Sequence, residues 1–369
     1  EDVAAIQSGL GNEAISVNYY IDAQKYFASI PLSSRRRLFY SAASDGADEF
    51  ERLLFKSFML NVPRFHIEAL SYLRKKIISG GELPKVMVTN TDHYDNDFAK
   101  LFMAETVRAG GKIIWGQHGS GIYTGYHLMN EVVEAELPDR YFCWGWAKPE
   151  QQKIVNMPSL SVSCLVKKQL NVSKFNNGPL LLISTNGTKY FFRILSMYGS
   201  SDWIHYSDMQ ADFIATLQKN IREEMFYRPY FFDYEQGHLE RIKQVNPSMT
   251  VLTEGNIEQY FCKFRVVVVD HCTSCIGSLL ALNKPCVFFW DKHYCRDNTM
   301  SAPVFEALNN AGLLHYSAKS AAEFVNSIYD DPKKWWSRDD VQEARSLYCQ
   351  RHSRYSGTYI DEWVARVRE

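Results

Sequence analysis

The sequence lacks any apolar run long enough to cross a bilayer. Its longest apolar stretches, residues 266–269 and 286–290, have the length of a buried strand, whereas a membrane-spanning helix needs about 20 apolar residues. Residues 1–10 also lack the basic start and apolar stretch of a secretion signal. We therefore expect a cytoplasmic protein, free or at the inner face of the inner membrane, with at most peripheral membrane association.

The chain has no excess of charge of either sign. Its 41 lysine and arginine residues almost balance 42 aspartate and glutamate residues, which gives a formal net charge of -1. This balance excludes a bulk electrostatic attraction to nucleic acid or to an anionic membrane, so no nucleic-acid partner is expected. Any anionic ligand has to be bound by a few local groups.

Cysteine is present, but without the spacing of a metal or disulfide framework. Cys272 and Cys275, with His271 beside them, raise the alternatives of a zinc site or a redox pair. A zinc ribbon needs a second pair of cysteines, and thioredoxin-like motifs occur in a much smaller fold. We therefore expect free thiols, no metal and no other cofactor. The eight cysteines are Cys143, Cys164, Cys262, Cys272, Cys275, Cys286, Cys295 and Cys349.

At 369 residues, the chain is long enough for two α/β domains. A strand at 85–89, a helix at 98–109 and a second strand at 112–115 predict a β-α-β crossover. Parallel sheets bind ligands beyond the carboxyl ends of their strands, so the loop that begins at residue 116 is a candidate site.

The second half of the chain repeats the alternation of strands and helices. The strand-like segments are 180–184, 225–228, 250–252, 266–270 and 287–290, and the helical windows are 208–224, 255–262, 274–283 and 302–312. This order predicts a second doubly wound parallel sheet and the fold class α/β, with two Rossmann-like domains. The expected domains are 1–172, which begins with a mostly helical extension over 1–80, and 173–345. Weak strands and a linker at 156–178 are expected where the two domains meet. A helix over 346–369 is expected to pack back on the first domain.

Two loops of the second half carry small hydroxyl side chains beyond a strand. Thr273 and Ser274 open a helix after a buried strand, where free N–H groups suit a phosphate, or they are an ordinary helix cap without a ligand. Ser184 begins the other loop, which ends at Lys189. Lys189 either contacts a ligand or is an ordinary solvated lysine. The chain contains neither Gly-x-Gly-x-x-Gly nor a Walker sequence, which disfavours a dinucleotide dehydrogenase and a P-loop NTPase.

Several motifs, in order along the chain, carry a resemblance to a known family. They are Gln117-His118-Gly119, Glu134 followed by residues 139–146, residues 203–208, Arg228-Pro229-Tyr230 with Asp233 and Tyr234, the turn at 270–277, and residues 331–336. From about residue 85 to its end, the chain resembles the bacterial retaining β-Kdo glycosyltransferases and related bacterial transferases. Residues 1–80 lie outside the resemblance, and the related transferases usually carry a glutamate where this chain has Gly277.

The resemblance implies a GT-B fold, CMP-β-Kdo as the donor, and a glycan or lipid-linked glycan of a surface polysaccharide as the acceptor. It also implies a double displacement with Asp208 as the nucleophile, Glu134 as the acid/base partner and His238 as a helper near the donor. Taken alone, an acidic residue at a helix start is usually a cap or a solvated side chain. Two inversions nevertheless require a carboxylate that bonds to the anomeric carbon.

The donor's chemistry suggests which groups bind it. CMP carries one phosphate, so amide and hydroxyl groups at Thr273 and Ser274 suffice without a metal that bridges two phosphates. The Kdo carboxylate needs a cationic or N–H-rich site, for which Arg228, Lys189, His118 and the Gly119 backbone are candidates, with Gln117 and Ser184 alongside.

Three alternatives remain open. An inverting, sialyltransferase-like CMP-sugar transferase would use Glu134 or Asp139 as a base, without a covalent step. A non-catalytic sugar-binding module would keep the fold without turnover. The chain is also compatible with one module of a larger glycosyltransferase.

Overall fold

A computed structural model describes residues 2–11, 30–42, 48–119, 129–169, 175–187, 198, 200–232, 234–295 and 298–369. The chain forms two compact units, one of Asn12–Trp115 and one of Glu1–Gly11 with Gly116–Glu369. The domain boundaries expected after residues 172 and 345 therefore stay predictions. Within the described ranges, no helix combines the length and the apolar character that a membrane crossing needs.

The unit of Asn12–Trp115 is mostly helical, as the sequence of residues 1–80 predicts. Its elements are α3 (Ser34–Ala42), α4 (Glu49–Asn61), the π-helix η2 (Phe65–Ala69), α5 (Leu70–Ser79), β1 (Val86–Thr89), α6 (Asp92–Asp95), α7 (Asp97–Arg108) and β2 (Lys112–Gly116). Strands β1 and β2 pair in parallel around α7, which confirms the β-α-β crossover. Helix α7 is capped by the Asn96 side chain, which accepts from the backbone N–H of Ala99 at 3.0 Å.

One arginine of the basic triplet at 35–37 is structural. Arg36 is 2% exposed and donates two hydrogen bonds of 2.9 Å, from Nε and Nη2, to the carboxylate of Glu68. The hydrogen bond from Arg36 lowers the pKa of Glu68 to about 2. A basic triplet on a helix is usually a solvated face, but a charge this well buried is stable only when paired, so Arg36 joins α3 to η2.

The other unit contains a pair of parallel strands, β3 (Arg140–Cys143) and β4 (Ile154–Asn156). Helix α8 (Met129–Glu136) precedes them in the chain and helix α9 (Leu160–Lys168) follows them. The expectation of weak strands and a linker at 156–178 is wrong for α9, whose first turn is capped by Ser159. Helix α18 (Tyr359–Arg368) packs against α1 (Asp2–Leu10) and α9, and Trp363 donates to the carbonyl of Pro158 at 2.8 Å.

Strand β3 ends at Cys143, before the end of the apolar run at residues 141–146. Gly145 has a φ of 123°, a backbone conformation that side chains other than glycine rarely adopt. A Cβ at this position would also overlap the carbonyl group of Gln350. The strand therefore stops at Cys143 and turns where only a glycine fits against helix α17 (Asp339–His352).

The second sheet has six strands in the order β10-β9-β8-β5-β6-β7, and every pair of neighbours is parallel. The strands are β5 (Leu180–Ile183), β6 (Phe226–Arg228), β7 (Thr250–Val251), β8 (Val266–Val269), β9 (Cys286–Phe289) and β10 (Leu314–His315). The first strand in sequence, β5, lies in the middle, and the chain leaves it in opposite directions through β6 and β8. This arrangement confirms the doubly wound sheet and makes the ends of β5 and β8 its switch point.

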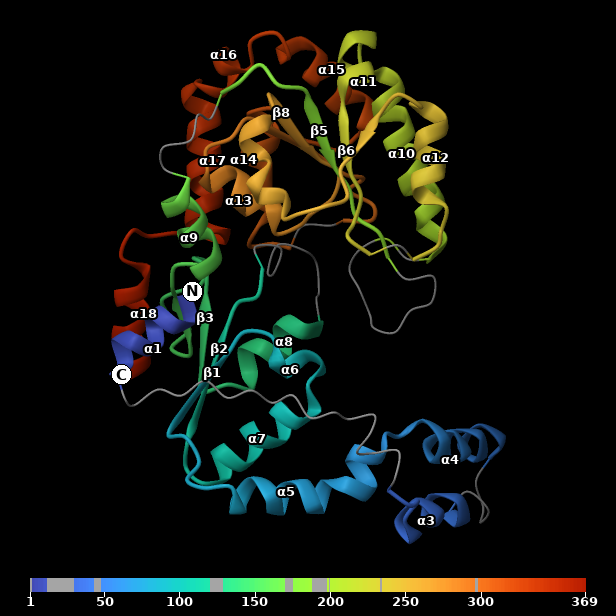
Figure 1. Ribbon diagram of the computed structural model, residues 1–369, viewed down its shortest axis with the longest axis vertical. Helices are drawn as coiled ribbons and strands as arrows, with labels where there is room; N and C mark the ends of the chain where they lie inside the picture. Colours follow the sequence, from blue (N-terminus) through green and yellow to red (C-terminus); the bar gives the residue numbers. More distant parts are fainter. Residues whose placement is uncertain are drawn as a thin grey trace. The chain divides into compact units, whose positions relative to one another are not determined.

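Helices cover both faces of this sheet, which explains its continuous apolar strands (Figure 1). Helices α10 (Trp203–Thr216), α12 (His238–Val245) and α15 (Ala318–Ile328) lie on one face, and α13 (Cys275–Ala281), α14 (Ala302–Asn310) and α17 on the other. All four valines of β8 are fully buried. Two short helices, α11 (Lys219–Glu224) and α16 (Pro332–Trp336), complete the unit.

Two of the expected helical windows differ in the structure. The window at 208–224 is divided between α10 and α11, because Leu217 is extended and buried and the backbone N–H of Gln218 bonds to Asn326 at 2.9 Å. The window at 255–262 contains two 3-10 turns, Ile257–Gln259 and Phe261–Lys263, in place of an α-helix.

A buried histidine makes this unit sensitive to acid. His352 is 1% exposed, and neither of its ring nitrogens has a hydrogen-bond partner among the residues that the structure describes. Burial, and secondarily Arg351, lowers the pKa of His352 to about 4 from an ordinary value of 6.5. The neutral ring is thus favoured by folding, so its contribution is complete above pH 6.5 and is lost as the pH falls toward 4. We expect a loss of about 2 kcal/mol between pH 7 and pH 5.

Urea unfolding at the two pH values measures this loss. His352→Leu removes the titrating group, so the variant is expected to lose about 2 kcal/mol less than the wild type over the same interval. The exposed His293→Leu is the control and should follow the wild type. An unchanged pH dependence in His352→Leu would show that other groups cause the acid sensitivity.

Candidate functional site

A buried carboxylate organises the switch point of the second sheet. Asp270 directly follows β8 and is completely inaccessible. Its Oδ1 accepts from the Tyr206 hydroxyl at 2.6 Å and lies 2.9 Å from Nδ1 of His271, and its Oδ2 accepts from the Gln210 amide. A carboxylate without solvent needs several such donors, and these three join α10 to the turn after β8.

The same network reaches the loop after β5. The Ser184 hydroxyl lies 3.0 Å from the Tyr206 hydroxyl and also bonds to Gln210, and the backbone N–H of Thr185 donates to Tyr206 at 3.0 Å. Burial, and then the charge of Asp270, raises the pKa of Tyr206 well above its ordinary value, so this phenol stays a donor to Asp270. Ser184, a predicted donor contact, is thus buried in the network and holds the loop.

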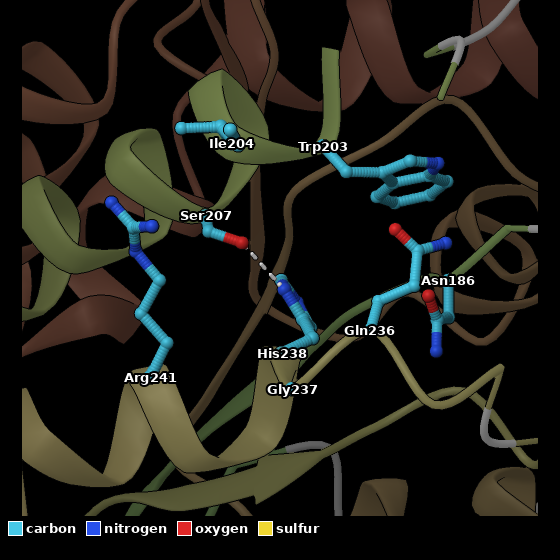
Figure 2. Close-up of a pocket in the computed structure, with 8 residues that line it drawn as sticks. All are labelled: Asn186, Trp203, Ile204, Ser207, Gln236, Gly237, His238 and Arg241. Carbon is cyan, nitrogen blue, oxygen red and sulfur yellow. Dashed lines mark hydrogen bonds between the residues drawn. The ribbon is translucent and has the colours of Figure 1, made fainter. Parts of the chain in front are cut away.

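A pocket of about 110 Å³ adjoins this network, since its lining includes Asn186 and Ser207, the residues that follow Thr185 and Tyr206 in the chain. Figure 2 shows its lining, which combines an indole, two amides, a histidine and an arginine. The lining residues are Asn186, Trp203, Ile204, Ser207, Gln236, Gly237, His238 and Arg241. An aromatic face beside several hydrogen-bonding groups suits a polyhydroxylated ligand.

His238, a predicted site residue, is held in this pocket from two sides. Its Nδ1 lies 2.7 Å from the Ser207 hydroxyl, and its ring stacks on that of Tyr206 with a centroid distance of 5.4 Å. Gly237, with a φ of 66°, turns the chain so that His238 begins α12. Ser207 and Tyr206 are adjacent on α10, so a single turn of this helix fixes the position of the His238 ring.

Asp208, the predicted nucleophile, lies beside the pocket and is accessible. Its side chain is 52% exposed and forms an ion pair with Arg241, which lines the pocket one turn after His238. Asp270 is fully buried and engaged by three donors, so only Asp208 of these two carboxylates can meet a substrate. The structure thus brings Asp208 and His238 together through α10 and α12.

The predicted phosphate turn is placed at the same switch point. Thr273 is half-buried and Ser274 is exposed at the start of α13. The predicted residue Gly119 lies against it, since a Cβ added at 119 would overlap the Ser274 hydroxyl. Cys275 follows and is half-buried, and burial raises the pKa of its thiol. A thiol with a raised pKa stays protonated, which makes it a poor nucleophile and a poor metal ligand.

Arg228 is engaged elsewhere. Its guanidinium donates to the backbone carbonyls of Leu252 and Glu254 at 2.9 Å and of Gly255 at 2.8 Å. These bonds tie the end of β6 to the loop after β7. The role predicted for Arg228, binding of the sugar carboxylate, stays a prediction. The arginine that lines the pocket is Arg241. Lys189 lies outside the described residues.

The predicted site residue Gln117 is held by the residues that follow strand β3. Gln117 is buried, and its side chain bonds to the Gly119 carbonyl at 2.8 Å and to backbone and indole N–H groups of Trp144 and Trp146 at 2.9 Å. Gln117 therefore shapes the loop that begins at 117, where His118 is exposed.

Glu134, the predicted acid/base residue, lies on α8 and is 1% exposed. The Tyr141 hydroxyl donates to its Oε2 at 2.5 Å. Asp208 and His238, in contrast, lie on helices that cover the second sheet. The catalytic pairing of Glu134 with Asp208 stays a prediction.

Sequence reasoning missed the central residues of the buried network. Tyr206, Ser207 and Asp270 lie within motifs named above, and Gln210 lies outside them, but the sequence predicts a role for none of the four. One signal was available, because an aspartate that directly follows four buried valines stands at the carboxyl end of a parallel strand. The partners of Asp270 come from another helix and could not be identified from spacing.

Two parallel sheets, the second with a switch point that carries polar side chains, define a protein with a GT-B-like α/β fold. A family profile matches residues 17–367, so the chain belongs to the LIC12162 family of transferases. No curated protein sequence matches the chain significantly.

Solved structures confirm the expected fold. The chain is similar to MnaA of S. aureus, in a co-structure with UDP, with a TM-score of 0.52 and 12% identity over 100% of this chain and 93% of that chain. It is also similar to a Listeria monocytogenes protein provisionally assigned as a UDP-N-acetylglucosamine 2-epimerase. In that case the TM-score is 0.50, with 12% identity over 82% of this chain and 79% of that chain.

Proposed function

We propose that this transferase is a retaining glycosyltransferase that moves β-Kdo from CMP-β-Kdo to a glycan acceptor of a bacterial surface polysaccharide. The observation that carries the proposal is the link between Asp208 and the pocket. Arg241 lines the pocket and pairs with Asp208, and His238 lines it one turn away. An accessible carboxylate thus stands beside a pocket with hydrogen-bonding and cationic groups.

The pocket's chemistry supports an acidic sugar. The amides of Asn186 and Gln236 and the indole of Trp203 suit a hydroxylated ring, and Arg241 supplies a cation for a carboxylate (Figure 2). The neighbouring turn at Thr273 and Ser274 would hold the single phosphate of CMP. A UDP complex of the similar S. aureus structure supports a nucleotide-linked donor on this fold.

In the proposed reaction, the Asp208 carboxylate attacks the anomeric carbon of Kdo, and the bond to the phosphate oxygen breaks with its electron pair going to CMP. An acceptor hydroxyl then attacks the same carbon, its proton passes to Glu134, and Asp208 leaves. Each step inverts the anomeric carbon, so the product keeps the donor's β configuration. His238 contacts the donor from its place beside Ser207.

Turnover with a donor panel tests the proposal. The full chain is incubated with CMP-Kdo, CMP-sialic acid or UDP-sugars and with synthetic glycan acceptors, and nucleotide release is measured above the rate with heat-inactivated protein. We expect acceptor-dependent CMP release from CMP-Kdo, and a β-linked product by NMR. An α-linked product would support the inverting alternative.

Two further outcomes would overturn the proposal in different ways. Binding of CMP without any release from CMP-sugars would indicate a non-catalytic sugar-binding module. Release from a UDP-sugar alone would show that the donor is another nucleotide sugar, while the transferase class would stand.

A further inference from the structure

Helix α4 carries apolar side chains on two faces, and one of them is open to solvent. Phe55 is half-buried, packs edge-to-face on Phe58 at 6.3 Å, and belongs to the helix that contacts α3. Phe50 and Leu53 lie at helical spacing on a different face and are 70% and 67% exposed. Soluble helices usually bury one apolar stripe and present polar groups elsewhere.

The open face is extensive. Leu54 continues it at i+4 from Phe50, and Leu60, which is 85% exposed, extends it at the end of the helix. Exposed leucines occur singly on most proteins, but a contiguous run of large apolar side chains marks an interaction surface.

Cationic side chains flank apolar surface on the neighbouring helix. Because Arg36 is turned inward to Glu68, the opposite face of α3 presents Leu38, which is 66% exposed, between the exposed Arg35 and Arg37. Two of the three acidic residues at the start of α4, Asp48 and Glu51, have a local role because they form a reciprocal capping box, and Glu49 is exposed. The exposed arginines are thus available for an anionic partner.

We propose that the pair of helices α3 and α4 is a docking surface for anionic phospholipid bilayers. Binding at a membrane surface has two elements. Apolar side chains enter the boundary between headgroups and acyl chains, and arginines contact the headgroups. Anionic headgroups attract such arginines, and the attraction is screened by salt. The surface lies in residues 34–61, so the proposal does not depend on the reaction proposed above.

Vesicle sedimentation with the full chain tests the proposal. We expect the protein to sediment with phosphatidylcholine vesicles that contain phosphatidylglycerol, to remain in solution with phosphatidylcholine alone, and to dissociate as salt increases. Phe50→Ser/Leu53→Ser and Arg35→Glu/Arg37→Glu are each expected to lower the partition coefficient by at least about tenfold. Circular dichroism verifies that both variants fold.

Matched variants control for the chemistry of each change. Val107→Ser/Leu137→Ser removes two exposed apolar side chains elsewhere, and Lys75→Glu/Lys76→Glu reverses two exposed charges on α5. Both are expected to sediment as the wild type does. Absence of sedimentation at low salt, or equal losses in test and control variants, would overturn the proposal. A dimer in light scattering that Phe50→Ser/Leu53→Ser dissociates would instead assign the surface to a second copy.

Discussion

Asp208→Asn is expected to lower kcat with CMP-Kdo by on the order of 10³-fold or more, with little change in KM. The amide keeps the shape of the carboxylate and an oxygen that accepts from Arg241, so the pocket is expected to stay intact. A neutral amide cannot, however, form the covalent bond to the anomeric carbon. The rate of CMP release under saturating donor measures the loss.

Asp212→Asn is the matched control for this prediction. Asp212 lies one turn further along α10 and is likewise exposed, so its variant should keep the wild-type rate. Mass spectrometry of the wild type with donor and no acceptor should reveal one Kdo residue on a peptide that contains Asp208. A fully active Asp208→Asn enzyme would eliminate the double displacement through this residue.

Asp270→Ala is expected to destabilise the unit of Gly116–Glu369 by about 3–5 kcal/mol. The substitution leaves the Tyr206 hydroxyl, the Gln210 amide and the His271 ring without their shared acceptor inside a protein core. Each buried donor then loses a hydrogen bond that water cannot replace. Urea unfolding at pH 7 measures the difference.

The exposed ion pair of Asp340 with Arg338 provides the comparison. Asp340→Ala removes a carboxylate that is 47% exposed, and is expected to cost at most about 1 kcal/mol. Tyr206→Phe removes one bond to Asp270 but keeps the ring that stacks on His238, so an intermediate loss is expected. An Asp270→Ala variant as stable as Asp340→Ala would show that the buried carboxylate is not needed for folding.

Much of the fold could be predicted because it depends on local patterns. Four consecutive valines predict β8, and alternation of such runs with helical windows predicts a doubly wound sheet, as the structure confirms. The failures have tertiary causes. Helix α10 ends before Leu217 because the side chain of Asn326, on α15, accepts a hydrogen bond from the backbone N–H of Gln218. Strand β3 ends before Gly145 because the carbonyl group of Gln350, on α17, lies where a Cβ would be.

The candidate site was only partly predictable. The two loops at the ends of β5 and β8 follow from the sequence, because carboxyl ends of adjacent parallel strands must share an edge. The roles of individual side chains depend on partners distant in the chain. Arg228 bonds to carbonyls of the next loop, Gln117 to the turn after β3, and Ser184 to α10, so spacing alone could not tell a ligand contact from a structural residue.

The central position of β5 has a consequence for synthesis of the protein. The ribosome releases β5, α10 and α12 before β8, so Tyr206 and Gln210 emerge before Asp270, their acceptor. A nascent chain that ends after α12 has the indole, imidazole and arginine of the pocket, but lacks Asp270, the acceptor that holds Tyr206 against His238. We therefore expect the protein to become able to bind its ligand late in translation, once β8 has paired with β5 in the second sheet.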